Sequence, residues 1–284
     1  MAMAFLAMLC WGFGDFLIQK SARKLGDWET LFVICAFGAV ILLPFVWRDL
    51  PALFGNGRGV WVLFLSSLIL FVAALLDFEA LKEGKLAVVE SIWSFEVPAA
   101  AILAFVILGE RISWLQIILI TLLIGGLIMV SFHRVRASFK KLLMERGVII
   151  AFIAAITMGS ADFFLGWGAR VTDPIMANFF LNVFITICSA IYLFGAGRLR
   201  RTFKDALSFG RVLLPMSIFD NTAWVSYALA MTLAPIAVAT ALSESYIIVV
   251  VSLGLFVNHE KIQTHQKAGL ILAIITAITL AAIT

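Results

Sequence analysis

The sequence predicts an all-α polytopic membrane protein: ten transmembrane helices that form two inverted five-helix repeats around a central cavity. Three observations lead to this prediction, namely an apolar composition, ten apolar segments of membrane-spanning length, and an internal repeat. Of the 284 residues, 63% are hydrophobic and only 13% are charged, whereas an ordinary soluble domain is about 25% charged. We therefore expect an integral membrane protein, placed in a prokaryotic cytoplasmic (inner) membrane.

Each expected helix is a stretch of about 20 consecutive, predominantly apolar residues, the length that spans a bilayer. The breaks between them are polar or turn-forming stretches such as "KEGK" and "RDLPALFGNGR". None of the breaks is long enough for a soluble domain. The opening "MAMAFLAMLCWGF" lacks the basic start of a secretory signal, so we interpret it as the first helix. The expected spans are 2–20, 28–47, 59–81, 86–108, 112–132, 147–168, 174–196, 211–233, 236–257 and 264–283.

The two halves of the chain repeat each other. A shift of 147 positions places Gly12 on Gly159 and Asp15 on Asp162, and a shift of 150 later in the chain places "ERI" on "EKI". Because five spans per repeat is an odd number, the second copy must enter the membrane from the opposite side, as in the inverted repeats of many secondary transporters. The predicted organisation is a first repeat at 1–132, a basic connecting loop at 133–146 and a second repeat at 147–284.

Carboxyl groups within the expected spans are the main functional signal. A charged side chain at the centre of a membrane helix costs about 2.5 to 3.5 kcal/mol on insertion scales, so it rarely faces lipid. Glu90 and Ser94 are four residues apart, and Trp93 and Glu96 are three apart, so each pair is expected to share one face of the fourth span. Glu244 aligns with Ser94 in the repeat. The candidate substrate-binding or coupling residues are Asp15, Glu90, Trp93, Glu96, Asp162, Asp220, Trp224, Tyr227 and Glu244.

Two chemical interpretations fit these acids. On the eighth span, Trp224 follows Asp220 by four residues and Tyr227 follows Trp224 by three. Acid beside aromatic suits an organic cation, which a carboxylate and a ring face both attract. Buried carboxyl groups also suit a proton relay, because removal from water favours the protonated acid.

Structural interpretations of the same residues remain open. Tryptophan and tyrosine at helical spacing also serve packing or the interfacial belt. Asp15 and Asp162 lie nearer the ends of their spans than the centre, where a carboxyl group can bond to neighbouring backbone. Glu110 lies beside Arg111 at a helix boundary, and Glu260 lies beside Lys261 in the repeat. We expect these two glutamates to serve helix ends and local ion pairs.

Other classes of site have no support in the sequence. Cys10, Cys35 and Cys188 show no C-x-x-C spacing, and none of the three histidines pairs with a second ligand at helical spacing. We therefore predict no metal site, no cofactor and no enzyme activity, since a nucleophile with its base is also missing. A G-x-x-x-x-G-K-[ST] motif for nucleotide binding is missing too.

The chain resembles the EamA-type permeases of the drug/metabolite transporter superfamily. The resemblance lies in "WGFGDFLIQK" at the end of the first span, in "ALKEGKLAVVESIWSFEVPAAAILAFVILGERI" across the fourth, and in "YALAMTLAPIAVATALSESYIIVVVSLGLFVNHEKI" at its repeat. It implies ten helices around a central cavity and carriage of small metabolites. Where this family usually has small and hydroxyl residues before the proline of the fourth helix, this chain has Glu90 and Glu96.

The small multidrug resistance relatives imply a role for two of the acids. Those proteins use an acidic residue in the first helix of each subunit for both the proton and the cationic substrate. Asp15 and Asp162 stand in the first helix of each half. The resemblance is one of helix and chemistry only, since the surrounding "GDF" is not that family's motif.

The predicted function is secondary active transport, by alternating access and coupled to protons, of a small polar metabolite with an amino or cationic group. The alternative is a passive facilitator or channel for a small neutral solute. A further alternative is a neutral or anionic metabolite, with the acids carrying protons only. The expected partners are a small-molecule substrate, protons and the lipid bilayer, not nucleic acid, and the protein is expected to be a monomer or a homodimer.

Basic residues predict the orientation. All but four of the 21 lysines and arginines fall in the loops after the odd-numbered spans. The positive-inside rule then places those loops in the cytoplasm and both termini outside it, whereas members of the resembling family keep their termini in the cytoplasm. The four exceptions are Arg48, Arg58, Arg111 and Arg170.

Overall fold

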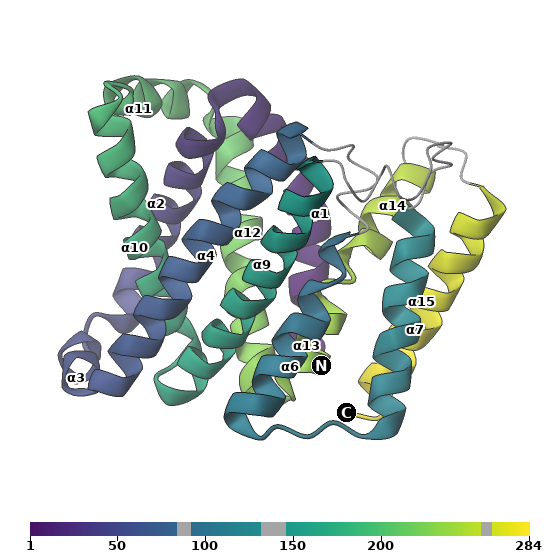
Figure 1. Cartoon of the computed structure of the whole chain (residues 1–284). Coiled ribbons are helices and arrows are strands. Elements are labelled where there is room, and N and C mark those ends of the chain that lie inside the picture. Colours follow the sequence, from purple (N-terminus) through teal and green to yellow (C-terminus); the bar gives the residue numbers. More distant parts are fainter. Residues whose placement is uncertain (84–91, 132–145, 257–262) are drawn as a thin grey trace.

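A computed structural model describes residues 1–83, 92–131, 146–256 and 263–284, and this part of the chain is a bundle of helices without strands (Figure 1). The long helices run between two ends of the bundle, and α11 and α3 lie at opposite ends. The helices are α1 (Ala2–Leu25), α2 (Asp27–Val46), α3 (Leu50–Gly55), α4 (Gly57–Glu83), α6 (Glu96–Leu108), α7 (Trp114–Ser131), α9 (Arg146–Val171), α10 (Pro174–Gly195), α11 (Leu199–Ser208), α12 (Gly210–Leu233), α13 (Ile236–Ser243), α14 (Tyr246–Phe256) and α15 (Thr264–Ala282).

Two of the expected spans are interrupted. In the described part of the expected span 86–108, the chain turns at Ser94 and Phe95, and α6 begins at Glu96. The expected span 236–257 is interrupted in the same way, because Glu244 and Ser245 separate α13 from α14, although Ile236–Leu253 as a whole is suited to cross a membrane. The two breaks lie 150 positions apart, which is the offset of the repeat in this part of the chain.

By length and composition, seven helical segments of the described chain are suited to cross a membrane. Shorter apolar helical stretches occur at Ala2–Gly14 and Glu96–Leu108. The sequence did not predict α3 and α11, which form in stretches that were expected to be polar breaks. Pro51 stands in the first turn of α3, where its missing N–H costs no hydrogen bond.

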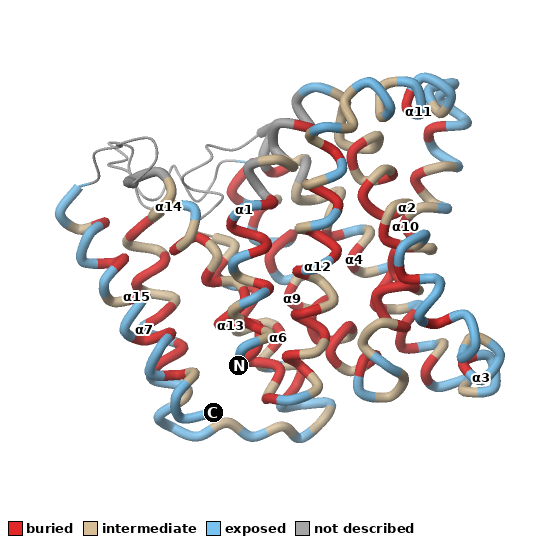
Figure 2. The backbone as a smooth tube through the Cα atoms, turned by 180° about the vertical axis from the view of Figure 1, so that it is seen from behind, coloured by how far each residue is buried: buried red, intermediate tan, exposed pale blue. Residues whose placement is uncertain are grey.

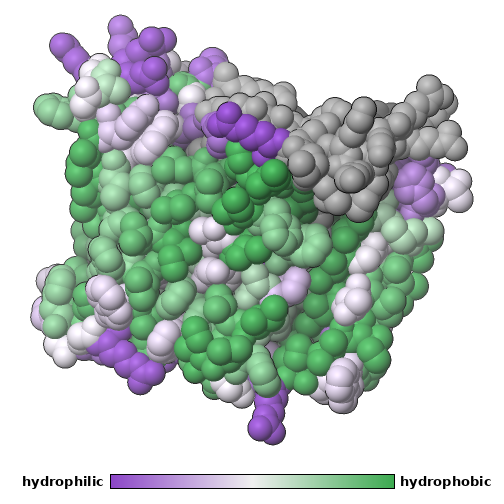
Figure 3. All heavy atoms as spheres, viewed as in Figure 1, coloured by the Kyte–Doolittle hydropathy of each residue, from purple (hydrophilic) through white to green (hydrophobic). Residues whose placement is uncertain are grey.

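The outside of the bundle is apolar between two polar ends. Figure 3 shows a broad hydrophobic surface with hydrophilic side chains gathered at the top and the bottom. Val40 and Val106 are each 69% exposed, which suits contact with lipid chains. In Figure 2, many helices have buried positions along one side and exposed positions along the other. The core therefore runs along the inside of the bundle.

Helices of the first half pack against helices of the second half in a repeated pattern. Helix α4 packs on α9, and α1 packs on α12; in the repeat, α1 corresponds to α9 and α4 to α12. The contact of α1 with α12 is therefore equivalent to the contact of α9 with α4 after the two halves are exchanged. Helix α2 packs on its own counterpart α10, and α7 packs on its counterpart α15.

Two glycines at corresponding positions of the repeat make equivalent contacts between the halves. A Cβ atom on Gly159 of α9 would overlap the carbonyl oxygen of Glu96 and lie 2.8 Å from Cβ of Ala99. A Cβ atom on Gly12 of α1 would lie 2.6 Å from Cβ of Val249, the residue that corresponds to Ala99. Glycine at these positions lets α9 and α1 approach the first turns of α6 and α14 closely.

We expect Gly159→Ala to destabilise the protein by about 1 to 3 kcal/mol, because the added methyl group meets backbone and not a flexible side chain. The measurement is the thermal unfolding midpoint in detergent, followed by tryptophan fluorescence. Gly125→Ala on α7 is the matched control, since no atom lies within 4 Å of a Cβ there. Equal midpoints for the two variants would show that the α6–α9 contact is not tight.

Candidate functional site

Three carboxyl groups from three segments meet inside the bundle. Glu96 is the first residue of α6, Asp162 lies on α9, and Glu244 lies in the break between α13 and α14. One carboxylate oxygen of each lies within 4.8 Å of the other two. Asp162 is 1% exposed and Glu96 4% exposed, while Glu244 is half-buried. We call these three residues the carboxyl triad.

The local backbone explains how the triad is assembled. Asp162 follows Gly159 by three residues, so both lie on the face of α9 that contacts the start of α6. Glu96 stands in the first turn of α6, where unpaired backbone N–H groups favour a negative charge. Glu244 projects from a two-residue interruption of the ninth span. The triad therefore depends on both helix breaks and on one close helix contact.

A chain of hydroxyl groups leads away from Asp162. Its carboxyl group interacts with the side-chain hydroxyl of Tyr227, which lies 2.8 Å from Oγ1 of Thr240. Thr240 in turn donates to the carbonyl oxygen of Ile236, at 2.9 Å. Oδ2 of Asp162 has no hydrogen-bond partner among the described residues. This buried oxygen is open to a proton or another cation.

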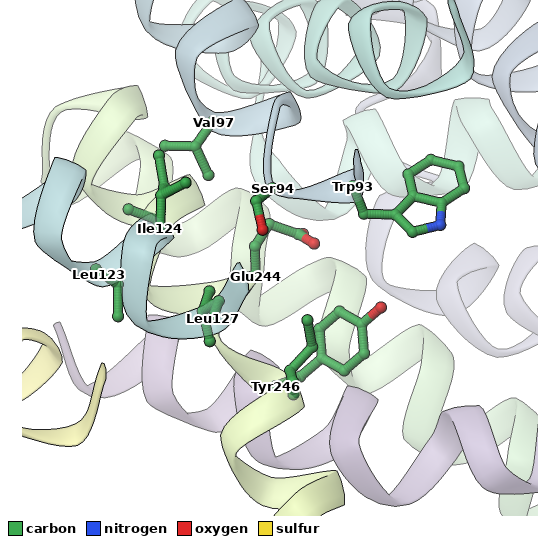
Figure 4. A pocket seen from close by; sticks show the side chains of 10 residues that line it. Trp93, Ser94, Val97, Leu123, Ile124, Leu127, Glu244 and Tyr246 are labelled. Atoms are coloured by element: carbon green, nitrogen blue, oxygen red, sulfur yellow. The ribbon is translucent and has the colours of Figure 1, made fainter. Parts of the chain in front are cut away.

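A small cavity adjoins the triad (Figure 4). Its lining includes Ser94, Glu244, Trp93 and Tyr246, and its volume is about 10 Å³, enough for one water molecule. The buried hydroxyl of Ser94 has no hydrogen-bond partner within the described part of the chain. Figure 4 shows Ser94 and Glu244 next to each other and the Trp93 ring pointing away from them. In this conformation the cavity accepts a water molecule or a small ion, and a larger solute requires the cavity to open.

Asp220 lies apart from the triad. Its carboxyl group interacts with the Trp224 side chain one turn along α12. Trp11 on α1 contacts the rings of Trp224 and Tyr227, each at 5.2 Å between centroids. The two predicted aromatic residues therefore pack against each other and Trp11. The sequence did not predict Trp11 as a residue of this aromatic cluster, although Trp11 belongs to the "WG" motif at the end of the first span.

Beside Asp220, Asn221 connects three helices. Its amide group donates to the carbonyl oxygen of Ile34 on α2 at 3.2 Å and accepts from Asn182 on α10 at 2.9 Å. Gly38 on α2 leaves the space that this pair occupies, since a Cβ there would overlap both amides. Such polar contacts between helices are common packing elements in membranes. We therefore regard Asn221 as a structural neighbour of Asp220.

The remaining predicted site residues are described in part. Glu90 lies outside the described residues, and Asp15 lies on α1 with its side chain outside the described part. The expectation that Trp93 and Glu96 share one helix face is wrong, because the turn at Ser94 and Phe95 separates them. Trp93 still borders the same cavity as Glu244.

A second polar cluster joins the two halves near the α3 end of the bundle. Arg170 at the end of α9 forms an ion pair with Glu110 at 2.8 Å, and it also donates to the carbonyl oxygens of Met231 and Ala234 at 2.7 and 2.8 Å. Glu110 accepts a hydrogen bond from the backbone N–H of Ile236, the first residue of α13, at 2.8 Å. The partner of Glu110 is thus Arg170 and not its neighbour Arg111. We call this cluster the Glu110–Arg170 bridge.

The model of the EamA-like transporter family matches residues 1–132 and 145–282. The chain belongs to this family. It is therefore a membrane transporter of the drug/metabolite transporter superfamily, whose members are transporters and not enzymes.

The fold of this EamA-like transporter is also similar to that of solved structures. A solved structure described as "Crystal structure of protein" is similar to it with a TM-score of 0.77 and 15% sequence identity, over 99% of this chain and 96% of the other. At that identity the similarity shows the fold alone. No curated protein matches the chain.

We expect Arg170→Met to lower the free energy of unfolding by about 1 to 3 kcal/mol, because it leaves the Glu110 carboxylate and two carbonyl groups without their donor. The side chains are 27% and 14% exposed, so water screens part of the loss. Arg146→Gln is the control, since its contact with Glu79 spans 3.8 Å between exposed groups. If both variants unfold at the same temperature, the bridge does not stabilise this conformation.

Proposed function

We propose that this protein is a secondary active transporter that moves a small polar metabolite with an amino or cationic group and is coupled to protons. One observation carries the proposal: three carboxyl groups from both halves of the chain meet at two helix breaks. Discontinuous helices in corresponding positions of two repeats form the substrate and ion sites of many secondary transporters. The proposed substrate-binding or coupling residues are the triad together with Asp15, Glu90, Trp93, Asp220, Trp224 and Tyr227.

The charge of the triad supports a positive occupant. Three carboxyl groups whose oxygens lie within 4.8 Å of one another repel strongly when all are ionised in surroundings of low dielectric constant. Protons or a cation bound there would reduce that repulsion. Because both interact with the same groups, they compete, and competition at a site that is exposed alternately to the two sides of a membrane exchanges one species for the other.

The packing pattern supports alternating access between two inverted repeats, 1–132 and 147–284, of five helices each. The main contacts between the halves have counterparts with the halves exchanged, as α4 on α9 and α1 on α12 show. In such a fold, the outward-open and inward-open states are related by exchanging the conformations of the two repeats. The Glu110–Arg170 bridge ties the halves together at the α3 end, so that opening at this end has to break it.

A thermal-shift screen of amines, amino acids, sugars and nucleotides identifies the substrate class. We expect cationic or amino-bearing solutes to raise the unfolding midpoint, since only these pair with the triad. The best ligand is then tested in proteoliposomes with a pH gradient, where we expect uphill accumulation. A passive facilitator would only equilibrate the solute, and stabilisation by sugars or phosphates alone would refute the cation proposal.

In the same assay, we expect Asp162→Asn to abolish pH-driven transport while the folded protein still binds substrate, because the amide has no exchangeable acidic proton. Asp15→Asn is expected to do the same, since Asp15 corresponds to Asp162 in the repeat. Asp205→Asn on α11 is the control, because that side chain lies on the surface in a pair with Arg201. Normal gradient-driven uptake by both test variants would make the two aspartates structural and move the coupling to Glu90, Glu96 or Glu244.

We further propose that the α11 end of the bundle faces the cytoplasm. Both chain termini lie away from this end, on the side of α3 (Figure 1), and α11 with its flanks holds five basic residues between Arg198 and Arg211. A reporter that is active only outside the cytoplasm, fused after Thr284, should therefore be active. Activity of a cytoplasm-only reporter at the same position would reverse the orientation.

A further inference from the structure

Helix α11 lies across one end of the bundle, between α10 and α12 (Figure 1). The chain reaches it through a sharp turn in which Gly197 adopts a φ of 67°, a conformation that favours glycine. The backbone N–H of Arg198 then donates to the carbonyl oxygen of Leu193 at 2.8 Å. This closed turn fixes the helix at a large angle to α10, as Figure 1 shows.

The inner face of α11 is held by the bundle. Thr202 is 2% exposed, and Ala206 packs with Phe209 against the buried residues Leu213 and Met216 of α12. Phe203 contacts Phe32 of α2 edge to face, at 5.5 Å between ring centroids. The helix is therefore docked on the protein and does not depend on an outside partner to form.

The outer faces of α11 differ in chemistry. Leu207 is 87% exposed and Phe203, one turn earlier, is 56% exposed, so an apolar edge projects from the end of the bundle. Arg200 and Lys204 are also four residues apart and exposed, and they form the neighbouring face. An apolar edge beside a basic face is the pattern of helices that lie in a membrane interface.

The basic face carries more positive charge than its local acids balance. Arg201 pairs with Asp205 at 3.3 Å, and Arg198 pairs with Glu29 at 3.6 Å. Among the described residues, Arg200, Lys204 and Arg211 form no ion pair. Figure 3 shows strongly hydrophilic side chains gathered over this corner, directly above the hydrophobic side of the bundle. The cationic groups thus stand at the level where lipid phosphates would lie.

We propose that the outer surface of α11, formed by Arg200, Lys204 and Leu207 with Arg211 beside it, binds anionic phospholipid. The phosphate groups meet the basic side chains, and the acyl chains cover the apolar edge. The partner is the lipid itself and not a soluble anion, because Leu207 gains nothing from a free phosphate ion. This site is separate from the carboxyl triad and does not depend on the proposed substrate.

The test compares full-length protein in nanodiscs of phosphatidylcholine alone and of phosphatidylcholine mixed with phosphatidylglycerol. We expect native mass spectrometry to find phosphatidylglycerol retained in preference to phosphatidylcholine, and the retention to fall with added salt. The variant with Arg200→Gln and Lys204→Gln should bind phosphatidylglycerol about five-fold more weakly for each charge removed. Arg48→Gln, at the other end of the bundle, is the control and should retain it as the unsubstituted protein does.

The variants must be compared as folded proteins. Because the substituted side chains are exposed, we expect all variants to unfold at the same temperature in phosphatidylcholine alone, and only the unsubstituted protein and the control to gain stability from phosphatidylglycerol. Equal retention by the double variant and the control would overturn the proposal. So would retention of inorganic phosphate in detergent at the same strength, because the acyl chains would then contribute nothing.

Discussion

The contact between Gly159 and the Glu96 carbonyl group is the constraint on which the proposed site depends. Any larger residue at 159 would separate α9 from the first turn of α6. Asp162 follows one turn later on the same face, so the contact brings its carboxyl group to Glu96. Each acid alone would cost about 2.5 to 3.5 kcal/mol in hydrocarbon. Together with Glu244 they form a polar interior, in which one bound proton or cation lowers that cost for all three acids.

The repeat conserves the backbone and changes the chemistry. Both breaks occur at the same offset, yet Glu244 corresponds to Ser94, and Tyr246 corresponds to Glu96. Glu96 and Glu244 therefore come from different positions at the two breaks, and Asp162 comes from the continuous helix α9. A movement that exchanges the conformations of the halves must change the distances between these carboxyl groups. Distance sets their mutual repulsion, so the affinity for protons or cations depends on the conformation.

The sequence predicted the long helices well because their length and apolarity are local properties; the expected span 174–196 is α10, Pro174–Gly195. It also identified the acids, because burying a charge in a membrane is costly wherever it occurs. It did not show which acids meet, since that depends on packing between distant helices. The first break had one local signal, Pro98 in the first turn of α6. The second break has no proline or glycine, so only the repeat could have indicated it.

The triad and the Glu110–Arg170 bridge are joined by two helices of the second half. Along α9, eight positions separate Asp162 from Arg170, and along α13 the same number separates Ile236 from Glu244, or about 12 Å of helix in each case. Thr240 in the middle of α13 holds Tyr227, which contacts Asp162. Helices of this length are stiff. A shift of Glu244 towards a bound cation is therefore carried along α13 to the backbone N–H of Ile236, which donates a hydrogen bond to Glu110. In the proposed cycle, α13 is therefore the element through which the occupant of the triad affects closure at the α3 end.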